Sequence, residues 1–247
     1  MNADGLAIIE HLNQVAAERQ ARALDPALSQ HVTAVKAYQH ARFERSYADL
    51  LRHPRYTAAA RFFLEELYGP NDFTRRDTQF ARVVPGLVRL FPHELVGTVR
   101  TLGELHALSE RLDTKMARLM EVLPITPAAY AAAWKAASPE SDRYRQIDLM
   151  VAVARALDRY VRNPVLRHSL RLMRGPARVA GLGELQTFLE SGFDTFRGMR
   201  GADEFLATVT SRERNLAAVL FGEDAVARAP DLPPAAKPDG EPADVGA

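Results

Sequence analysis

The residues best suited to chemistry in this chain are carboxylates and histidines that fall on apolar helix faces. Asp77 follows Phe73 and precedes Phe80 and Val84 at helical spacing, which places a carboxylate on a face expected to be buried. An isolated buried charge is costly, so it needs an ion pair, hydrogen-bond donors or a bound cation. Asp77 is therefore predicted to be either an anchor for a nearby arginine or a functional carboxylate that binds a metal or accepts a proton.

A second group follows about thirty residues later, in the segment ELHALSERLD. His106, Ser109, Glu110 and Asp113 are spaced by three or four residues and share one flank of a predicted helix. A histidine and a glutamate four residues apart can hold a metal or tune a general base. The same spacing also describes an ordinary pair on a helix surface.

A metal site inside a helical bundle is the hypothesis that unites these residues. Helical di-iron proteins place such ligands on facing helices, but their Glu-x-x-His signature on two helices does not occur here. Haem is a related alternative, with His106 or His168 as the axial ligand. The leading expectation is that no cofactor is bound, with iron or haem as the alternative. The candidate metal ligands are Glu65, Glu66, Asp77, His106, Glu110 and Asp148.

Four arginines near a glycine-bounded turn form the strongest basic group. A cluster of guanidinium groups is suited to phosphate binding. The net charge of +1 and the lack of a recognisable helix-turn-helix argue against nucleic acid, which is not expected as a partner. The candidate phosphate-binding residues are Arg167, Arg171, Arg174 and Arg178.

Several classes of chemistry are excluded by the composition. The chain has no cysteine, which rules out disulfides, thiolate metal sites, iron–sulfur clusters and cysteine nucleophiles. It contains no nucleophile elbow, no Walker loop and no His-Glu-x-x-His motif. The start of the chain lacks the charge pattern of a signal peptide, and no apolar run is long enough to span a membrane. A cytoplasmic protein without membrane contact is expected.

Periodicity predicts that helices alone position these residues. Apolar residues recur at threes and fours from residue 95 to 123, which predicts one long helix, and from 147 to 161. A helix over residues 73–91 is expected to kink at Pro85. Prolines at 26, 54, 92, 127, 139 and 164 mark helix starts, whereas Gly69-Pro70 and Gly175-Pro176 mark ends. The predicted fold is all-α, an antiparallel bundle of about eight to ten helices.

The domain organisation is predicted from a change in composition near residue 222. Residues 1–222 are expected to form a single helical domain, with a softer division near residue 124. Residues 223–247 hold five prolines and few large aliphatic side chains, too little apolar surface to offset the entropy of ordering the chain. They are predicted to be a disordered tail.

Three stretches resemble a family of uncharacterised proteobacterial all-helical proteins: residues 62–92, 104–113 and 185–206. The resemblance spans residues 35–222 and implies a helical fold, but it implies no activity and no catalytic residue. The leading functional hypothesis is a non-catalytic protein that acts on a protein partner or as a homodimer. The alternatives are a metal- or haem-dependent enzyme and a protein that binds phosphate or nucleic acid through arginines.

Overall fold

A computed structural model describes residues 2–66 and 73–235 of the chain. Helices joined by turns and loops make up this part of the chain. Thirteen helices occur in the described residues, ten of which have seven or more residues, and no strand does, which confirms the all-α prediction. The helices are α1 (Ala3–Ala23), α2 (Pro26–Ser46), α3 (Ala48–Arg52), α4 (Thr57–Glu66), α5 (Thr74–Leu90), α6 (His93–Arg118), α7 (Pro127–Ala137), α8 (Glu140–Tyr160), α9 (Pro164–Leu172), α10 (Arg174–Val179), α11 (Gly183–Gly198), α12 (Asp203–Phe221) and α13 (Ala225–Arg228).

Capping side chains and prolines set several of the helix starts. Asp25, Thr126 and Asn163 each accept a hydrogen bond from a backbone N–H of the first turn, and a proline follows each of them. The capping side chain satisfies a backbone N–H of the first turn that has no partner within the helix. Proline is tolerated at the first position because its N–H would have had no partner there. The proline-marked starts at residues 26, 127 and 164 are therefore confirmed.

Other predicted boundaries shift. The long helix α6 ends at Arg118 rather than near residue 123. Gly175 and Pro176, predicted to mark a helix end, lie instead in the first turn of α10, where a proline is tolerated. The break between α9 and α10 falls earlier, at Met173. Helix α5 continues through Pro85 to Leu90. The expected end at residues 69 and 70 lies outside the described residues.

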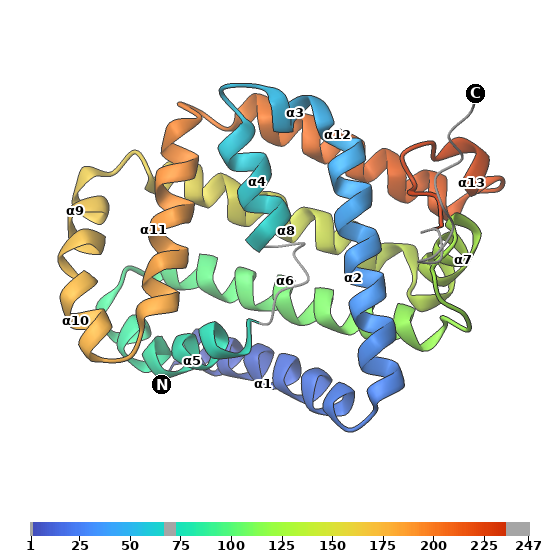
Figure 1. The fold of residues 1–247 in the computed structure, drawn as a ribbon. Coiled ribbons are helices and arrows are strands. Elements are labelled where there is room, and N and C mark those ends of the chain that lie inside the picture. Colours follow the sequence, from blue (N-terminus) through green and yellow to red (C-terminus); the bar gives the residue numbers. More distant parts are fainter. Residues whose placement is uncertain (1, 67–72, 236–247) are drawn as a thin grey trace, which may run out of the picture.

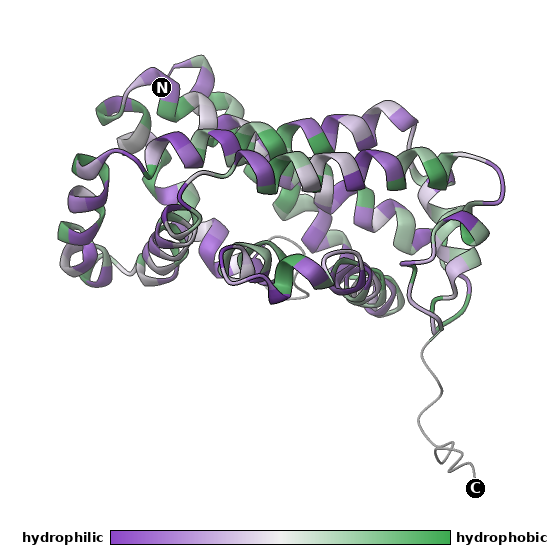
Figure 2. Ribbon diagram, turned by 90° about the horizontal axis from the view of Figure 1, so that it is seen from above, coloured by the Kyte–Doolittle hydropathy of each residue, from purple (hydrophilic) through white to green (hydrophobic). Residues whose placement is uncertain are grey.

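Two long helices, α6 and α8, lie side by side across the middle of the molecule (Figure 1). They are antiparallel, since Arg159 and Arg145 of α8 pair with Glu94 and Glu104 of α6. Helix α1 packs along α6, helix α2 crosses it, and α12 packs on α8. Helices α9 and α10 lie at one end of the molecule, and α7 and α13 lie at the other (Figure 1). Hydrophobic and hydrophilic residues alternate along the helices, as amphipathic packing requires (Figure 2).

One hydrophobic cluster fills most of the interior. It contains residues from both sides of position 124, from Leu28 in α2 to Leu232 near the end of the described chain. A smaller cluster joins α1, α5 and the start of α6 and contains Ile8, Leu12, Val84 and Val96. The charged side chains described below lie where α1, α2, α5 and α6 meet.

The segment after α12 differs from the prediction. Residues 223–235, expected to belong to a disordered tail, include α13 and pack on the domain: Ala229 and Leu232 are buried. The hydroxyl of Tyr38 donates a hydrogen bond of 2.8 Å to the carbonyl of Pro233. The folded part therefore extends beyond residue 222 to at least residue 235, and residues 236–247 lie outside the described part of the chain.

Ending the chain after Gly222 is expected to lower the free energy of unfolding by about 2–4 kcal/mol, because Leu232 and its neighbours leave the core. Chemical denaturation would measure the loss against a chain that ends at residue 235. Leu232→Ala should reproduce about half of it. Equal stability of the two shortened chains would show that the segment adds nothing to the fold.

Candidate functional site

The predicted site residues Asp77, His106 and Glu110 come together in a charge cluster that also contains Arg19, Arg22 and Lys36. Four helices supply it: α1 gives both arginines, α2 the lysine, α5 the aspartate, and α6 the histidine and glutamate. We refer to these six residues as the charge cluster. It lies below the surface, and each side chain is largely buried.

One half of the charge cluster is built around Asp77. Its Oδ2 lies 2.7 Å from Nε2 of His106 and 2.9 Å from a guanidinium nitrogen of Arg19. A carboxylate only accepts hydrogen bonds, so Nε2 of His106 must carry the proton that it shares with Asp77. A second arginine, Arg76, approaches Asp77 at 3.7 Å and pairs with Glu66 at 3.0 Å.

The other half is built around Glu110, whose two oxygens face different cations. Oε1 accepts a hydrogen bond of 2.8 Å from Nζ of Lys36, and Oε2 accepts one of 2.5 Å from Arg22. Arg22 also donates to the Glu110 carbonyl and to the hydroxyl of Thr114. Arg19 lies 3.7 Å from Oε1 and so links the two halves.

These contacts change the acidity of both carboxyl groups. Burial opposes the ionisation of Glu110, but the charges of Lys36 and Arg22 outweigh it and lower the pKa to about 2. Burial likewise opposes the ionisation of Asp77, whereas the hydrogen bond from His106 and the charge of Arg19 lower its pKa overall. Both groups are therefore carboxylates at neutral pH.

The arrangement is an ion-pair network rather than an open metal site. The carboxylate oxygens of Asp77 and Glu110 that face the interior of the cluster already contact arginine, lysine or histidine side chains. Across residues 2–66 and 73–235, no three His, Asp or Glu side chains are grouped in a way that could hold a metal ion. The network joins α1, α2, α5 and α6 through paired charges.

The remaining candidate ligands lie elsewhere. Glu66 pairs with Arg76 next to the charge cluster, but its neighbour Glu65 is exposed to solvent. Asp148 forms an ion pair with Arg214 on the exposed side of α8 and α12. His168, the second histidine considered for haem, is exposed on α9. Three of the six predicted metal ligands, Asp77, His106 and Glu110, therefore come together, and the other three lie outside the charge cluster.

The cations of the charge cluster were not predicted, yet a signal for them exists in the sequence. On α1 the buried positions Ile8, Leu12 and Val15 recur at threes and fours, and the same row continues at Arg19 and Arg22. A polar residue that continues an apolar row is expected to be buried and therefore paired. This row identifies both arginines.

A second buried ion pair joins α2 to α12. Arg42, which is 2% exposed, places its two terminal nitrogens 2.5 and 3.2 Å from the oxygens of Glu213. The hydroxyl of Tyr47 donates a third hydrogen bond, of 2.7 Å, to Glu213. This pair holds the two helices together inside the main hydrophobic cluster.

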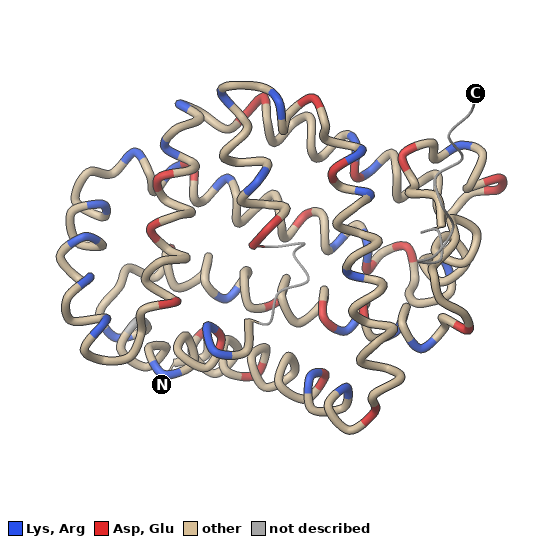
Figure 3. The backbone as a smooth tube through the Cα atoms, viewed as in Figure 1, with Lys and Arg blue, Asp and Glu red and all other residues tan. Residues whose placement is uncertain are grey.

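The four arginines predicted to bind phosphate lie on α9 and α10, at one end of the molecule (Figure 3). Arg167 and Arg174 are paired with Asp194 and Glu190 of α11. By contrast, Arg171 and Arg178 are exposed and form no ion pair with any residue that the structure describes. Two of the four guanidinium groups are therefore available to a ligand.

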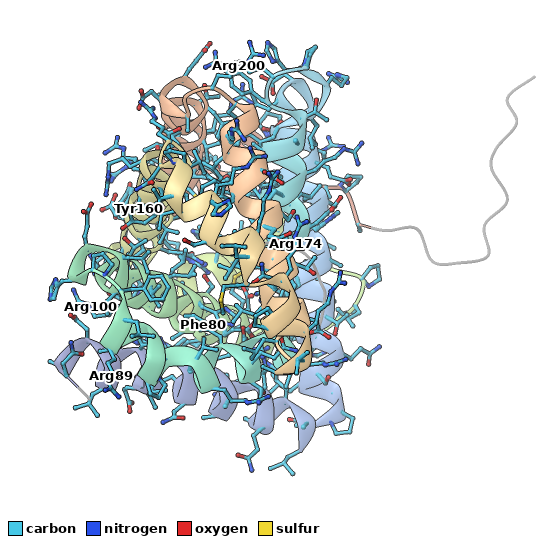
Figure 4. The ribbon with its side chains drawn as sticks, turned by 90° about the vertical axis from the view of Figure 1, so that its left-hand side faces the viewer. Phe80, Arg89, Arg100, Tyr160, Arg174 and Arg200 are labelled. Atoms are coloured by element: carbon cyan, nitrogen blue, oxygen red, sulfur yellow. The ribbon has the colours of Figure 1, made fainter. Side chains whose placement is uncertain are left out.

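Large aliphatic side chains accompany these two arginines. Val165, Leu172, Met173 and Val179 are 67%, 64%, 51% and 92% exposed. Figure 4 looks onto this end of the molecule, where Arg174 projects from the side of α9 and α10. We call the six residues Val165, Arg171, Leu172, Met173, Arg178 and Val179 the α9–α10 surface.

The fold and the charge cluster define an all-α protein whose buried charges connect its helices. Residues 18–227 match the family described as a domain of unknown function (DUF8198), and the chain belongs to this family. No curated protein and no solved structure is significantly similar to it. Among the helices of the described residues, none has the length and apolar character required to cross a membrane.

Proposed function

We propose that this protein is a non-catalytic binding protein that docks an acidic protein partner on the α9–α10 surface. The observation that carries the proposal is the combination, on one short segment, of four exposed aliphatic side chains with two arginines that lack an ion pair among the described residues. Exposed apolar groups next to unpaired charge of one sign are typical of surfaces that bind other proteins.

The local charge supports an acidic partner. Residues 164–183 contain four arginines and no aspartate or glutamate. Asp194 and Glu190 of α11 form ion pairs with two of these arginines, and the charge of Arg171 also acts on Glu190 from beyond ion-pair distance. Four arginines facing two carboxylates leave a net positive charge on the surface. Carboxylates of a partner would pair with them and also speed its approach.

Two other ligands fit this surface less well. Nucleic acid offers many phosphates and little apolar surface, whereas only two arginines are free here and four aliphatic groups surround them. Helices that lie in a membrane interface combine basic residues with tryptophan, phenylalanine and leucine. Residues 164–183 contain four leucines but no tryptophan or phenylalanine. A bacterial, cytoplasmic protein remains our expectation for its origin and location.

Site-specific photo-crosslinking tests the proposal. A photoreactive amino acid at position 172 is expected to trap a partner that the same group at Val122, exposed in the loop between α6 and α7, does not trap. With the trapped protein purified, Arg171→Glu/Arg178→Glu should weaken its binding at least tenfold, because opposite charges become like charges.

Three outcomes would overturn the proposal. The same proteins could be trapped from positions 172 and 122. The partner's affinity could be unchanged by the charge reversal. Cross-links could form only between two copies of the chain, which would identify the surface as a dimer interface.

A further inference from the structure

The exposed side chains of the α9–α10 surface follow a heptad spacing. Val165, Leu172 and Val179 are separated by seven residues each, and all three are exposed to solvent. Arg171 and Arg178 precede the second and third of them and are also seven residues apart. In helices that pack along one another, apolar residues recur at two positions of each heptad and charged residues flank them. Val165, Leu172 and Val179 supply one of these two positions, which gives a single apolar row.

The backbone carries this spacing across the break between the two helices. Met173, the residue between α9 and α10, keeps helical angles, with φ −73° and ψ −9°. Its N–H bonds to the carbonyl of Ser169, and its carbonyl accepts from the N–H of Ala177. These two hydrogen bonds have helical spacing, so the backbone stays helical at Met173, although α9 ends at Leu172 and α10 begins at Arg174. Val165, Leu172 and Val179 are exposed on both sides of the junction.

From this arrangement we infer that the α9–α10 surface takes its partner as an acidic amphipathic α-helix. The inference rests on the proposed function and adds the form of the partner. The aliphatic row of the partner helix packs against Val165, Leu172 and Val179, and its carboxylates pair with Arg171 and Arg178. Recognition of amphipathic helices by apolar surfaces uses anchors at such spacings.

One other mode of peptide binding, the addition of a strand to a sheet edge, is excluded in the residues that the structure describes. An extended peptide that adds to a sheet needs a strand edge, and the described residues contain no strand. A helix, by contrast, satisfies its own backbone and needs only an apolar row and matching charges from its host. The two free arginines decide the sign of those charges.

Synthetic peptides of three heptads test the inference directly. The probe carries leucine at the first and fourth heptad positions, glutamate at the flanking positions and alanine elsewhere. One control peptide replaces every glutamate with lysine. A second control keeps the leucines and glutamates but replaces two central alanines with proline, which breaks the helix. Binding to the full chain is followed by fluorescence anisotropy, and helix formation by circular dichroism.

The acidic peptide is expected to bind, and both control peptides at least tenfold more weakly. Arg171→Glu/Arg178→Glu should weaken binding of the acidic peptide at least tenfold. Arg118→Glu serves as the matched control, because Arg118 is exposed on α6 and forms no ion pair among the described residues. This control should leave the affinity within twofold of the original.

The outcomes separate the inference from the proposed function. If the proline peptide binds as well as the acidic helix, the helical form is refuted while acidic docking stands. If no peptide binds but a cross-linked partner depends on Arg171 and Arg178, the inference fails and the proposed function survives. If vesicles that contain phosphatidylglycerol bind and compete with the peptide through the same arginines, the surface serves a membrane and both fail.

Discussion

Replacing Arg42 with methionine is expected to lower the free energy of unfolding by about 3–5 kcal/mol, the typical cost of removing one partner of a buried ion pair. The side chain is 2% exposed, and its two terminal nitrogens bind both oxygens of Glu213. Without Arg42, the hydrogen bond from Tyr47 would be the only one left to this carboxylate from the residues that the structure describes. Equilibrium denaturation in urea measures the change.

Two further variants make this result specific. Arg45→Met removes an exposed arginine one turn along the same helix and should change stability by less than about 0.5 kcal/mol. Arg42→Met/Glu213→Gln removes both charges and should be more stable than Arg42→Met alone, because no charge is left buried without a partner. A loss below about 1 kcal/mol in Arg42→Met would contradict the importance of the pair.

Acidification from pH 5 to pH 2 is expected to remove about 3 kcal/mol of stability through Glu110. Its pKa in the folded protein is about 2, below the ordinary value of 4.5, because Lys36 and Arg22 outweigh the effect of burial. A lowered pKa means that the unfolded chain takes up the proton first. The stabilisation is therefore complete above pH 4.5 and is lost as the pH falls toward 2, at about 1.4 kcal/mol for each pH unit.

Glu110→Gln isolates this contribution from those of other groups. Burial raises the pKa of Asp113, so this residue opposes the trend, whereas Asp77 adds to it. The difference in unfolding free energy between the original chain and Glu110→Gln should therefore shrink as the pH falls from 5 to 2. Glu10→Gln, at an exposed position on α1, is the control. A difference that stays constant with pH would refute the assignment.

The helical architecture could be predicted from the sequence because its signals are local. Prolines preceded by Asp25, Thr126 and Asn163 mark starts that the structure confirms, since capping involves residues only a few positions apart. The end of the folded part could not be predicted in this way. Composition averages over the proline-rich segment, whereas a few specific contacts place it on the core: the burial of Ala229 and Leu232 and the hydrogen bond from Tyr38 to Pro233.

The candidate site could be predicted in part. Asp77, His106 and Glu110 are recognisable because they are polar side chains beside apolar rows, and the structure brings them together. The sequence predicted that Asp77 could anchor an arginine, but not that this arginine is Arg19 or that Lys36 pairs with Glu110, because both cations come from helices distant in the sequence. Spacing within one helix says which face a residue occupies, but not which residue of another helix meets it.

The free arginines of the α9–α10 surface show the same limit. The sequence predicts all four arginines as one phosphate-binding group, and nothing local distinguishes them. Asp194 and Glu190, on the following helix, neutralise two and leave Arg171 and Arg178. The pairing, and therefore the small number of available charges, follows from how α11 packs on α9 and α10.

The distance along the chain between Arg42 and Glu213 bears on how the protein is made. The two residues are 171 positions apart, so the guanidinium leaves the ribosome long before the carboxylate that neutralises it. At synthesis rates of about 5–20 residues per second, this delay is about 10–30 seconds. Because burial of an unpaired charge is unfavourable, packing Arg42 into the core before α12 is present would cost free energy. The final packing of the domain is therefore completed after most of the chain has been synthesised, when α12 arrives.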